Sequence, residues 1–216
     1  MSDQTTILLI RHGQTEWNAQ GRWQGHADVP LNETGRGQAQ ALARRLAAWP
    51  IQAIYASDLQ RAAETAVILG QTVGLSPQFD LQWRERDVGE FSGLTGDETR
   101  QRYPDVWQGM KRGVVNPPNG ETHDRLAERA IAAFHHALVR HEGEMAAVVS
   151  HGGTLAAVVT HVLGLPVHSY GRFSLRGNTG LSIVVQDERG IYVSLLNDTS
   201  HLSSIPVAIP QLSGAE

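Results

Sequence analysis

Two histidines, His12 and His151, have the sequence surroundings of reactive residues. They lie in the stretches 8–18 and 146–153, and in each stretch a short apolar run precedes the histidine and a glycine follows it. Such runs are typical of buried strands that end in loops. The carboxyl ends of parallel strands share one edge of a sheet, where ligands bind. We therefore expect both histidines to face one cleft.

The pairing of these stretches carries more weight than either histidine alone. The chain contains ten histidines, and a histidine after a strand can be an ordinary turn residue. Here Arg11 precedes His12, and the neighbouring glycines allow the backbone to approach a ligand closely. The combination favours a functional site over two unrelated turns.

The residue types around the histidines suit the transfer of a phosphoryl group. Arg11 and Arg61 can present forked donors to a phosphate dianion. A neutral imidazole can attack phosphorus through one ring nitrogen while a backbone carbonyl holds the other. We assign this attack to His12, and stabilisation of the equatorial oxygens to His151. One carboxyl group can protonate the leaving alkoxide and later deprotonate water, and Glu85 is the best placed.

Alternating strands and helices predict a three-layer α/β/α sandwich around a mostly parallel sheet. Strands are expected at about 7–10, 51–56, 79–81, 146–150, 181–185 and 191–196. Helices are expected to begin near Asn32, after a capping Ser57 or Asp58, at 120–122 and after Gly153. The second helix would carry Arg61 in its first turn, near His12. The last two strands form a hairpin that adds one antiparallel strand.

A polar, weakly helical segment at about 93–120 is expected to form an inserted cap within one domain that spans 1–216. It carries four cations, Arg100, Arg102, Lys111 and Arg112. Such charges usually form a solvated face, and the alternative is a clamp on a substrate in the cleft. The pattern does not decide between these two roles.

Composition narrows the function further. The 216 residues are 41% hydrophobic and 19% charged, with a net charge of −4, so the basic excess typical of nucleic-acid binding is missing. The absence of cysteine excludes thiol nucleophiles and disulfides. No apolar run reaches membrane-spanning length. We expect a cytoplasmic protein without membrane or nucleic-acid partners, and a homodimer is compatible with the sequence.

Several other catalytic motifs are absent from the sequence. There is no Gly-x-x-x-x-Gly-Lys phosphate loop, no Gly-x-Ser-x-Gly elbow and no His-Glu-x-x-His metal-binding helix. No coherent set of metal ligands remains, so we expect neither a metal nor a cofactor.

Glu85 has a structural alternative to catalysis, a salt bridge with Arg84 or Arg86.

Four parts of the sequence resemble the histidine phosphatase superfamily, also called phosphoglycerate-mutase-like: 9–18, 57–62, Glu85 before Gly89, and 150–153. The resemblance extends over about 7–201. It implies that the phosphoryl group lies among Arg11, His12, Arg61 and His151, with Glu85 as proton donor. It also implies phosphate contacts from Asn18, Gln24 and Gly152.

The stretches 88–93 and 197–202, together with the short cap, resemble the small-molecule phosphatase branch more than glycolytic mutases. Ser92 and Ala56 depart from that branch, in which glutamate and serine are common at these positions. The resemblance implies a metal-independent phosphatase that hydrolyses a small phosphorylated metabolite through a phosphohistidine. Two alternatives remain: a mutase that returns the phosphoryl group to its substrate, and a catalytically silent binding module.

Overall fold

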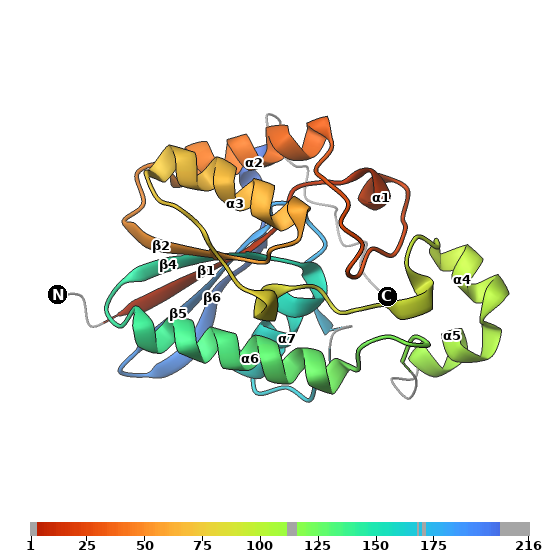
Figure 1. Ribbon diagram of the computed structural model, residues 1–216. Helices are drawn as coiled ribbons and strands as arrows, with labels where there is room; N and C mark the ends of the chain where they lie inside the picture. The colour runs from red at the N-terminus through yellow and green to blue at the C-terminus, as the bar shows by residue number, and fades with distance from the viewer. Residues whose placement is uncertain (1–3, 112–115, 168, 170–171, 204–216) are drawn as a thin grey trace, which may run out of the picture.

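A six-stranded sheet in the order β3-β2-β4-β1-β5-β6 forms the centre of the computed structural model, which describes residues 4–111, 116–167, 169 and 172–203 (Figure 1). Its strands are β1 Thr5–Arg11, β2 Ile51–Ala56, β3 Gln78–Phe79, β4 Met145–Ser150, β5 Leu181–Asp187 and β6 Gly190–Asp198. The pairs β1–β4, β2–β4 and β2–β3 are parallel, whereas β5 runs antiparallel to both β1 and β6. The predicted mostly parallel sheet with one antiparallel strand is confirmed.

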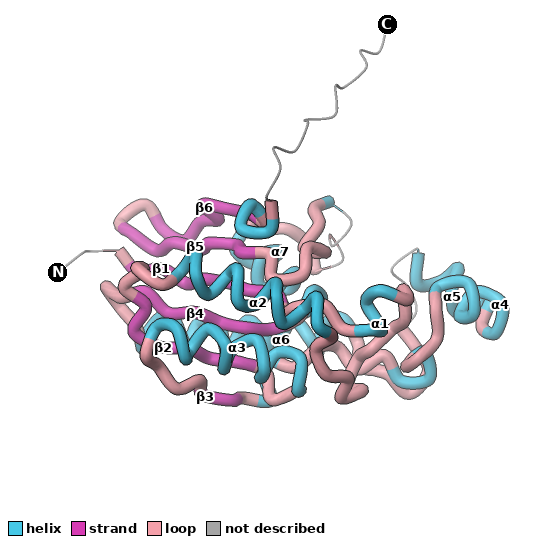
Figure 2. Tube along the Cα trace, turned by 90° about the horizontal axis from the view of Figure 1, so that it is seen from above, coloured by secondary structure: helices cyan, strands magenta, loops and turns pink. Residues whose placement is uncertain are grey.

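Helices cover both faces of the sheet, as the three-layer prediction requires (Figures 1 and 2). One face carries α2 Glu33–Leu46 and α3 Gln60–Val73, and the other carries α6 His123–Arg140 and α7 Gly152–Val162. In α2, α3 and α6 the buried residues recur at intervals of three and four, so each helix turns an apolar stripe to the sheet. No helix of the described residues is long and apolar enough to cross a membrane.

Strand β1 is buried on both faces, because it lies between β4 and β5 with helices above and below. Leu8 and Ile10 pack in the apolar cluster under α2 and α3, whereas Ile7 and Leu9 pack in the cluster under α6 and α7. All four side chains are fully buried. A strand buried on both sides reads as a continuous apolar run, which is why this segment was recognisable from sequence.

Of two local predictions in the region of α3 and β3, one is confirmed in part and the other is wrong. The short peripheral strand expected at 79–81 is present at the sheet edge as β3, but it has only two residues and is followed by a 3₁₀ helix, η1 Leu81–Trp83. Neither Ser57 nor Asp58 is the N-cap of α3, which is Leu59 without a side-chain hydrogen bond. Asp58 instead forms an ion pair with Arg84, 2.5 Å away.

The segment expected to form a cap contains two short helices, α4 Gly96–Arg102 and α5 Pro104–Lys111, beyond the carboxyl ends of the parallel strands (Figure 2). Arg100 pairs with Asp97 at 3.4 Å on an exposed surface, and Arg102 lies 5.5 Å from the centre of the Tyr103 ring. These contacts favour the solvated face for both arginines. Arg112 and the side chain of Lys111 lie outside the described residues.

Candidate active site

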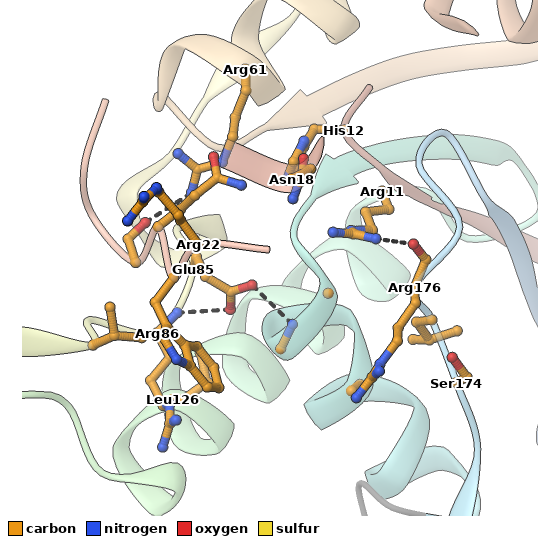
Figure 3. Close-up of a pocket in the computed structure, with 18 of the residues that line it drawn as sticks. Arg11, His12, Asn18, Arg22, Arg61, Glu85, Arg86, Leu126, Ser174 and Arg176 are labelled. Carbon is orange, nitrogen blue, oxygen red and sulfur yellow. Dashed lines mark hydrogen bonds between the residues drawn. The ribbon is translucent and has the colours of Figure 1, made fainter. Parts of the chain in front are cut away.

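A cavity of about 610 Å³ opens at the carboxyl edge of the parallel strands (Figure 3). Seven of the eight predicted site residues line it: Arg11, His12, Asn18, Gln24, Arg61, Glu85 and Gly152. The eighth, His151, is fully buried, and its ring centroid lies 5.1 Å from that of His12. The structure therefore brings together every residue that the sequence singled out for chemistry.

The two histidines meet because β1 and β4 are parallel neighbours in register. Arg11 pairs with Ser150 in the ladder, and the backbone N–H of His12 donates to the Ser150 carbonyl at 2.9 Å. Each histidine is thus the first residue past the end of its strand. His151 is also the N-cap of α7, so the positive end of that helix dipole faces the same edge.

The ring of His12 is held in one orientation by the backbone. Its Nδ1 lies 2.6 Å from the Gly13 carbonyl oxygen, so a neutral ring donates its Nδ1–H there and keeps the lone pair on Nε2. This tautomer, with the proton on Nδ1, is the one that a nucleophilic histidine requires. The loop itself packs closely, because a Cβ at Gly13 would lie 2.5 Å from the Gly35 carbonyl oxygen of α2.

Four buried nitrogen atoms around His12 have no hydrogen-bond partner among the described residues: Nε of Arg11, Nε of Arg61, and both ring nitrogens of His151. Buried polar groups nearly always have partners, so a cluster without them indicates a place for a ligand. The unpaired N–H groups of the two arginines suit the oxygen atoms of an anion.

Backbone carbonyls fix the two arginines before any ligand binds. Arg61 donates from Nη1 to the Ala27 carbonyl and from Nη2 to the Gly25 carbonyl, both at 2.8 Å, and Arg11 donates from Nη1 to the Arg176 carbonyl. Burial lowers the pKa of Arg61 to about 10, against the opposing effect of Glu85, so its guanidinium is still charged at neutral pH. The site therefore holds two positioned cations.

Both histidines are neutral in the free site. Burial first, then the charge of Arg61, lowers the pKa of each imidazole well below the ordinary value of 6.5. Arg11 lowers both pKa values further, and the Gly13 carbonyl opposes the shift at His12. A neutral His12 has the free lone pair that attack on phosphorus requires.

These lowered pKa values predict a loss of stability in acid. The unfolded chain takes up protons on both histidines below about pH 6.5, whereas the folded chain resists them until the lower folded pKa values are reached. The melting temperature should therefore fall as the pH drops below about 6.5. Thermal unfolding between pH 7.5 and 5 measures this, with His151→Gln flattening the slope and the exposed His136→Gln leaving it unchanged. An unaltered slope in His151→Gln would contradict the assignment.

Backbone N–H groups hold the carboxylate of Glu85, and the alternative salt bridge between Glu85 and Arg84 does not form. Its Oε1 accepts from the Arg86 N–H at 2.8 Å and its Oε2 accepts from the Gly153 N–H at 3.0 Å (Figure 3). Arg84 pairs with Asp58 instead. A Cβ at Gly153 would lie 2.4 Å from Glu85 Oε1, so glycine is what lets the carboxyl group lie against the first turn of α7.

Thr15 holds the side-chain amides of Asn18 and Gln24. Asn18 lies in the short helix α1, Glu16–Ala19, and its Oδ1 accepts from the Thr15 N–H at 3.1 Å. Gln24 Oε1 accepts from the Thr15 hydroxyl at 3.1 Å. Because both amide oxygens are engaged, the NH₂ groups are the parts of these side chains left to contact an anion.

The segment 172–180 completes the site, although nothing in its sequence pattern singled it out. The Asn178 amide and the Thr179 N–H both donate to the His12 carbonyl at 3.2 Å, and the Arg176 carbonyl accepts from Arg11. The signal lies in β5 instead, which runs antiparallel beside β1. The residues just before β5 must therefore lie at the carboxyl end of β1, next to His12.

Comparison with known proteins agrees with this geometry. The family model for the histidine phosphatase superfamily (branch 1) matches residues 7–199. A metal-independent phosphoserine phosphatase of Arabidopsis thaliana is 35% identical over 94% of this chain and 86% of its own length. A probable phosphoglycerate mutase, GpmB, of Salmonella arizonae is 35% identical over 92% of this chain and 95% of its own.

A solved structure adds a bound phosphomonoester. A mutant phosphoserine phosphatase of Entamoeba histolytica, in complex with phosphoserine, superposes with a TM-score of 0.80 at 26% identity, covering 92% of this chain and all of that one. Sequence, fold and the family match lead to one conclusion. The chain belongs to branch 1 of the histidine phosphatase superfamily.

Proposed function

We propose that this protein is a phosphatase that hydrolyses a small phosphomonoester through a phosphohistidine intermediate on His12, without a metal ion. The observation that carries the proposal is the cluster of buried nitrogen atoms around the nucleophile that have no partner among the described residues. A phosphoryl group supplies oxygen atoms for those N–H groups, and its negative charge balances Arg11 and Arg61.

In the first step, Nε2 of His12 attacks phosphorus and the bond to the ester oxygen breaks. Glu85 gives a proton to the departing alkoxide, which leaves as an alcohol. The amides of Asn18 and Gln24, the arginines, His151 and the Gly152 N–H at the start of α7 hold the equatorial oxygens as their charge redistributes. The proposed phosphate-binding residues are Arg11, Asn18, Gln24, Arg61, His151 and Gly152.

In the second step, water attacks the phosphohistidine and gives its proton to Glu85. The bond between phosphorus and His12 Nε2 breaks, the ring becomes neutral again, and inorganic phosphate leaves. The same carboxyl group thus acts as acid and then as base. The roles of Glu85 and His12 are consistent with their positions on the cavity wall.

Activity should survive excess chelator, because side chains fill every role in this mechanism. The described residues contain no group of three or more histidines and carboxylates that could hold a metal ion. We expect phosphate release from p-nitrophenyl phosphate, and from a panel of alkyl phosphates that includes phosphoserine, at equal rates with and without EDTA. Loss of activity that a divalent metal restores would contradict the proposal. The absence of all turnover would favour the silent binding module.

A mutase is the second candidate, supported by the similarity to a protein named probable phosphoglycerate mutase. The first step is shared, and the two functions differ in whether water or a second hydroxyl group accepts the phosphoryl group from His12. Incubation with 3-phosphoglycerate separates them. A phosphatase releases inorganic phosphate, whereas a mutase accumulates the 2-isomer with little release.

A further inference from the structure

We propose that Arg129 is a positioning residue for Glu85, and that its guanidinium fixes the backbone that carries the acid. The inference rests on the proposed function, in which Glu85 transfers the proton. Arg129 comes from the middle of α6 and is not among the residues that line the cavity. Its hydrogen bonds go to the segment that carries Glu85 and to Glu121, so it positions the acid without touching the substrate.

The guanidinium of Arg129 donates to three carbonyl oxygens of the segment that ends at the acid. Nη1 donates to the Gln82 carbonyl at 2.7 Å and to the Arg84 carbonyl at 2.6 Å, and Nη2 donates to the carbonyl of Glu85 itself at 2.9 Å. Residues 84–88 belong to no helix or strand, so their backbone groups need partners from elsewhere. Arg129 supplies such partners from α6 for the carbonyls of Arg84 and Glu85.

Glu121 holds the same guanidinium from its other side. Nε of Arg129 donates to Glu121 Oε1 at 2.7 Å, and Nη2 donates to Oε2 at 2.8 Å, a bidentate pair in which both side chains are largely buried. Burial works to raise the pKa of Glu121, but the bonds and charge of Arg129 outweigh it and leave the pKa lowered. Glu121 is therefore ionised at neutral pH.

These five bonds use all five N–H groups of Arg129, so the guanidinium has one orientation. The Glu121 N–H also donates to the Asp87 carbonyl at 2.9 Å, which ties the chain on the far side of Glu85 to the start of α6. The acid is thus anchored before and after its own position. Lysine could not replace this arrangement, because an ammonium group is a single point of charge.

Other contacts also hold the segment that carries Glu85. Loss of the Arg129 guanidinium should therefore displace Glu85 without unfolding the protein. The Thr154 hydroxyl donates to the Arg84 carbonyl at 2.7 Å, and His26 Nε2 lies 2.8 Å from the Glu85 carbonyl. A shift of a catalytic group by about 1 Å can cost roughly 100-fold in rate. The phosphate site, built by Arg11 and Arg61, should not move.

The experiment compares Arg129→Met with Arg125→Met, the same substitution at an exposed position one turn earlier on α6. Two substrates are used: p-nitrophenyl phosphate, whose leaving group needs little help from an acid, and the alkyl phosphate turned over fastest in the panel above. We expect Arg129→Met to lower kcat for the alkyl phosphate by roughly 10- to 100-fold with KM unchanged. The nitrophenyl ester should lose less than about 3-fold, and Arg125→Met should change neither rate.

A double-mutant cycle with Glu85→Gln gives the decisive measurement. If Arg129 acts only through the acid, Arg129→Met causes no further loss in the Glu85→Gln background. Equal losses on the two substrates, or additive losses in the cycle, would overturn the inference. If Arg129→Met does not fold, Glu121→Gln loosens the same guanidinium and is tested in the same way.

Failure of the proposed acid role of Glu85 and failure of the positioning role of Arg129 give different results. If Glu85→Gln itself shows no difference between the substrates, the acid role in the proposed function is wrong and the inference is wrong with it. Suppose instead that Glu85→Gln slows the alkyl phosphate more than the nitrophenyl ester, whereas Arg129→Met and Glu121→Gln slow both esters equally. Only the positioning role of Arg129 is then overturned.

Discussion

Replacing His12 with alanine should abolish turnover and prevent the protein from forming an acid-labile phosphoryl adduct. His12 lies on the cavity wall next to both arginines, with a neutral ring whose Nε2 lone pair is free to attack. Removing the nucleophile of a covalent mechanism costs at least roughly 1,000-fold in kcat. The measurement is single-turnover labelling with a ³²P-labelled phosphomonoester, quenched in alkali, alongside steady-state phosphate release.

The variant should still fold, because the side-chain hydrogen bond of His12 goes to its own neighbour in the chain, Gly13. Circular dichroism and the melting temperature check this. His151→Ala is the matched comparison, since it removes the second imidazole and should slow labelling without preventing it. The exposed His136→Ala should behave as the parent. A His12→Ala variant that still traps phosphate would show that another residue is the nucleophile.

The sequence predicted the sheet edge that carries the candidate site, because the strands and helices there follow simple periodicity. The runs before His12 and His151 are continuous and apolar, since β1 and β4 are buried on both faces of the sheet. Parallel neighbours bring their carboxyl ends together, so two similar stretches far apart in the chain had to meet. Arg61 followed from the same reasoning, because α3 begins just past the end of β2.

The contacts that orient the side chains of the candidate site could not be predicted from the local sequence pattern. Glu85 lies in a segment without regular structure, and its partners at Gly153 and Arg129 are more than 40 residues away along the chain. Asn178 and Arg176 lie in the irregular segment just before β5, whose place depends on β5 running antiparallel to β1. Asp58 looked like a helix cap because its type suits one, but the bidentate bond from Arg84 stabilises a different position.

Replacing Glu85 with glutamine should slow an alkyl phosphate far more than p-nitrophenyl phosphate. An alkoxide leaving group needs a proton in the transition state, whereas p-nitrophenolate is stable without one. The loss on the alkyl ester should be roughly 100-fold or more, the usual contribution of an acid-base group. Steady-state kcat on both substrates, with phosphoenzyme formation shown to limit each, gives the ratio.

The structure also supplies the control for this substitution. Each carboxylate oxygen of Glu85 accepts a backbone N–H, and an amide can satisfy only one of the two, so Glu85→Gln carries a structural cost as well. That cost lowers the melting temperature and acts on both substrates alike, whereas loss of proton transfer changes their ratio. Glu64→Gln makes the same chemical change on a carboxylate that lies outside the cavity and pairs with Arg36 of α2, and it should leave the ratio unchanged. Equal losses on the two esters in Glu85→Gln would remove Glu85 from the mechanism.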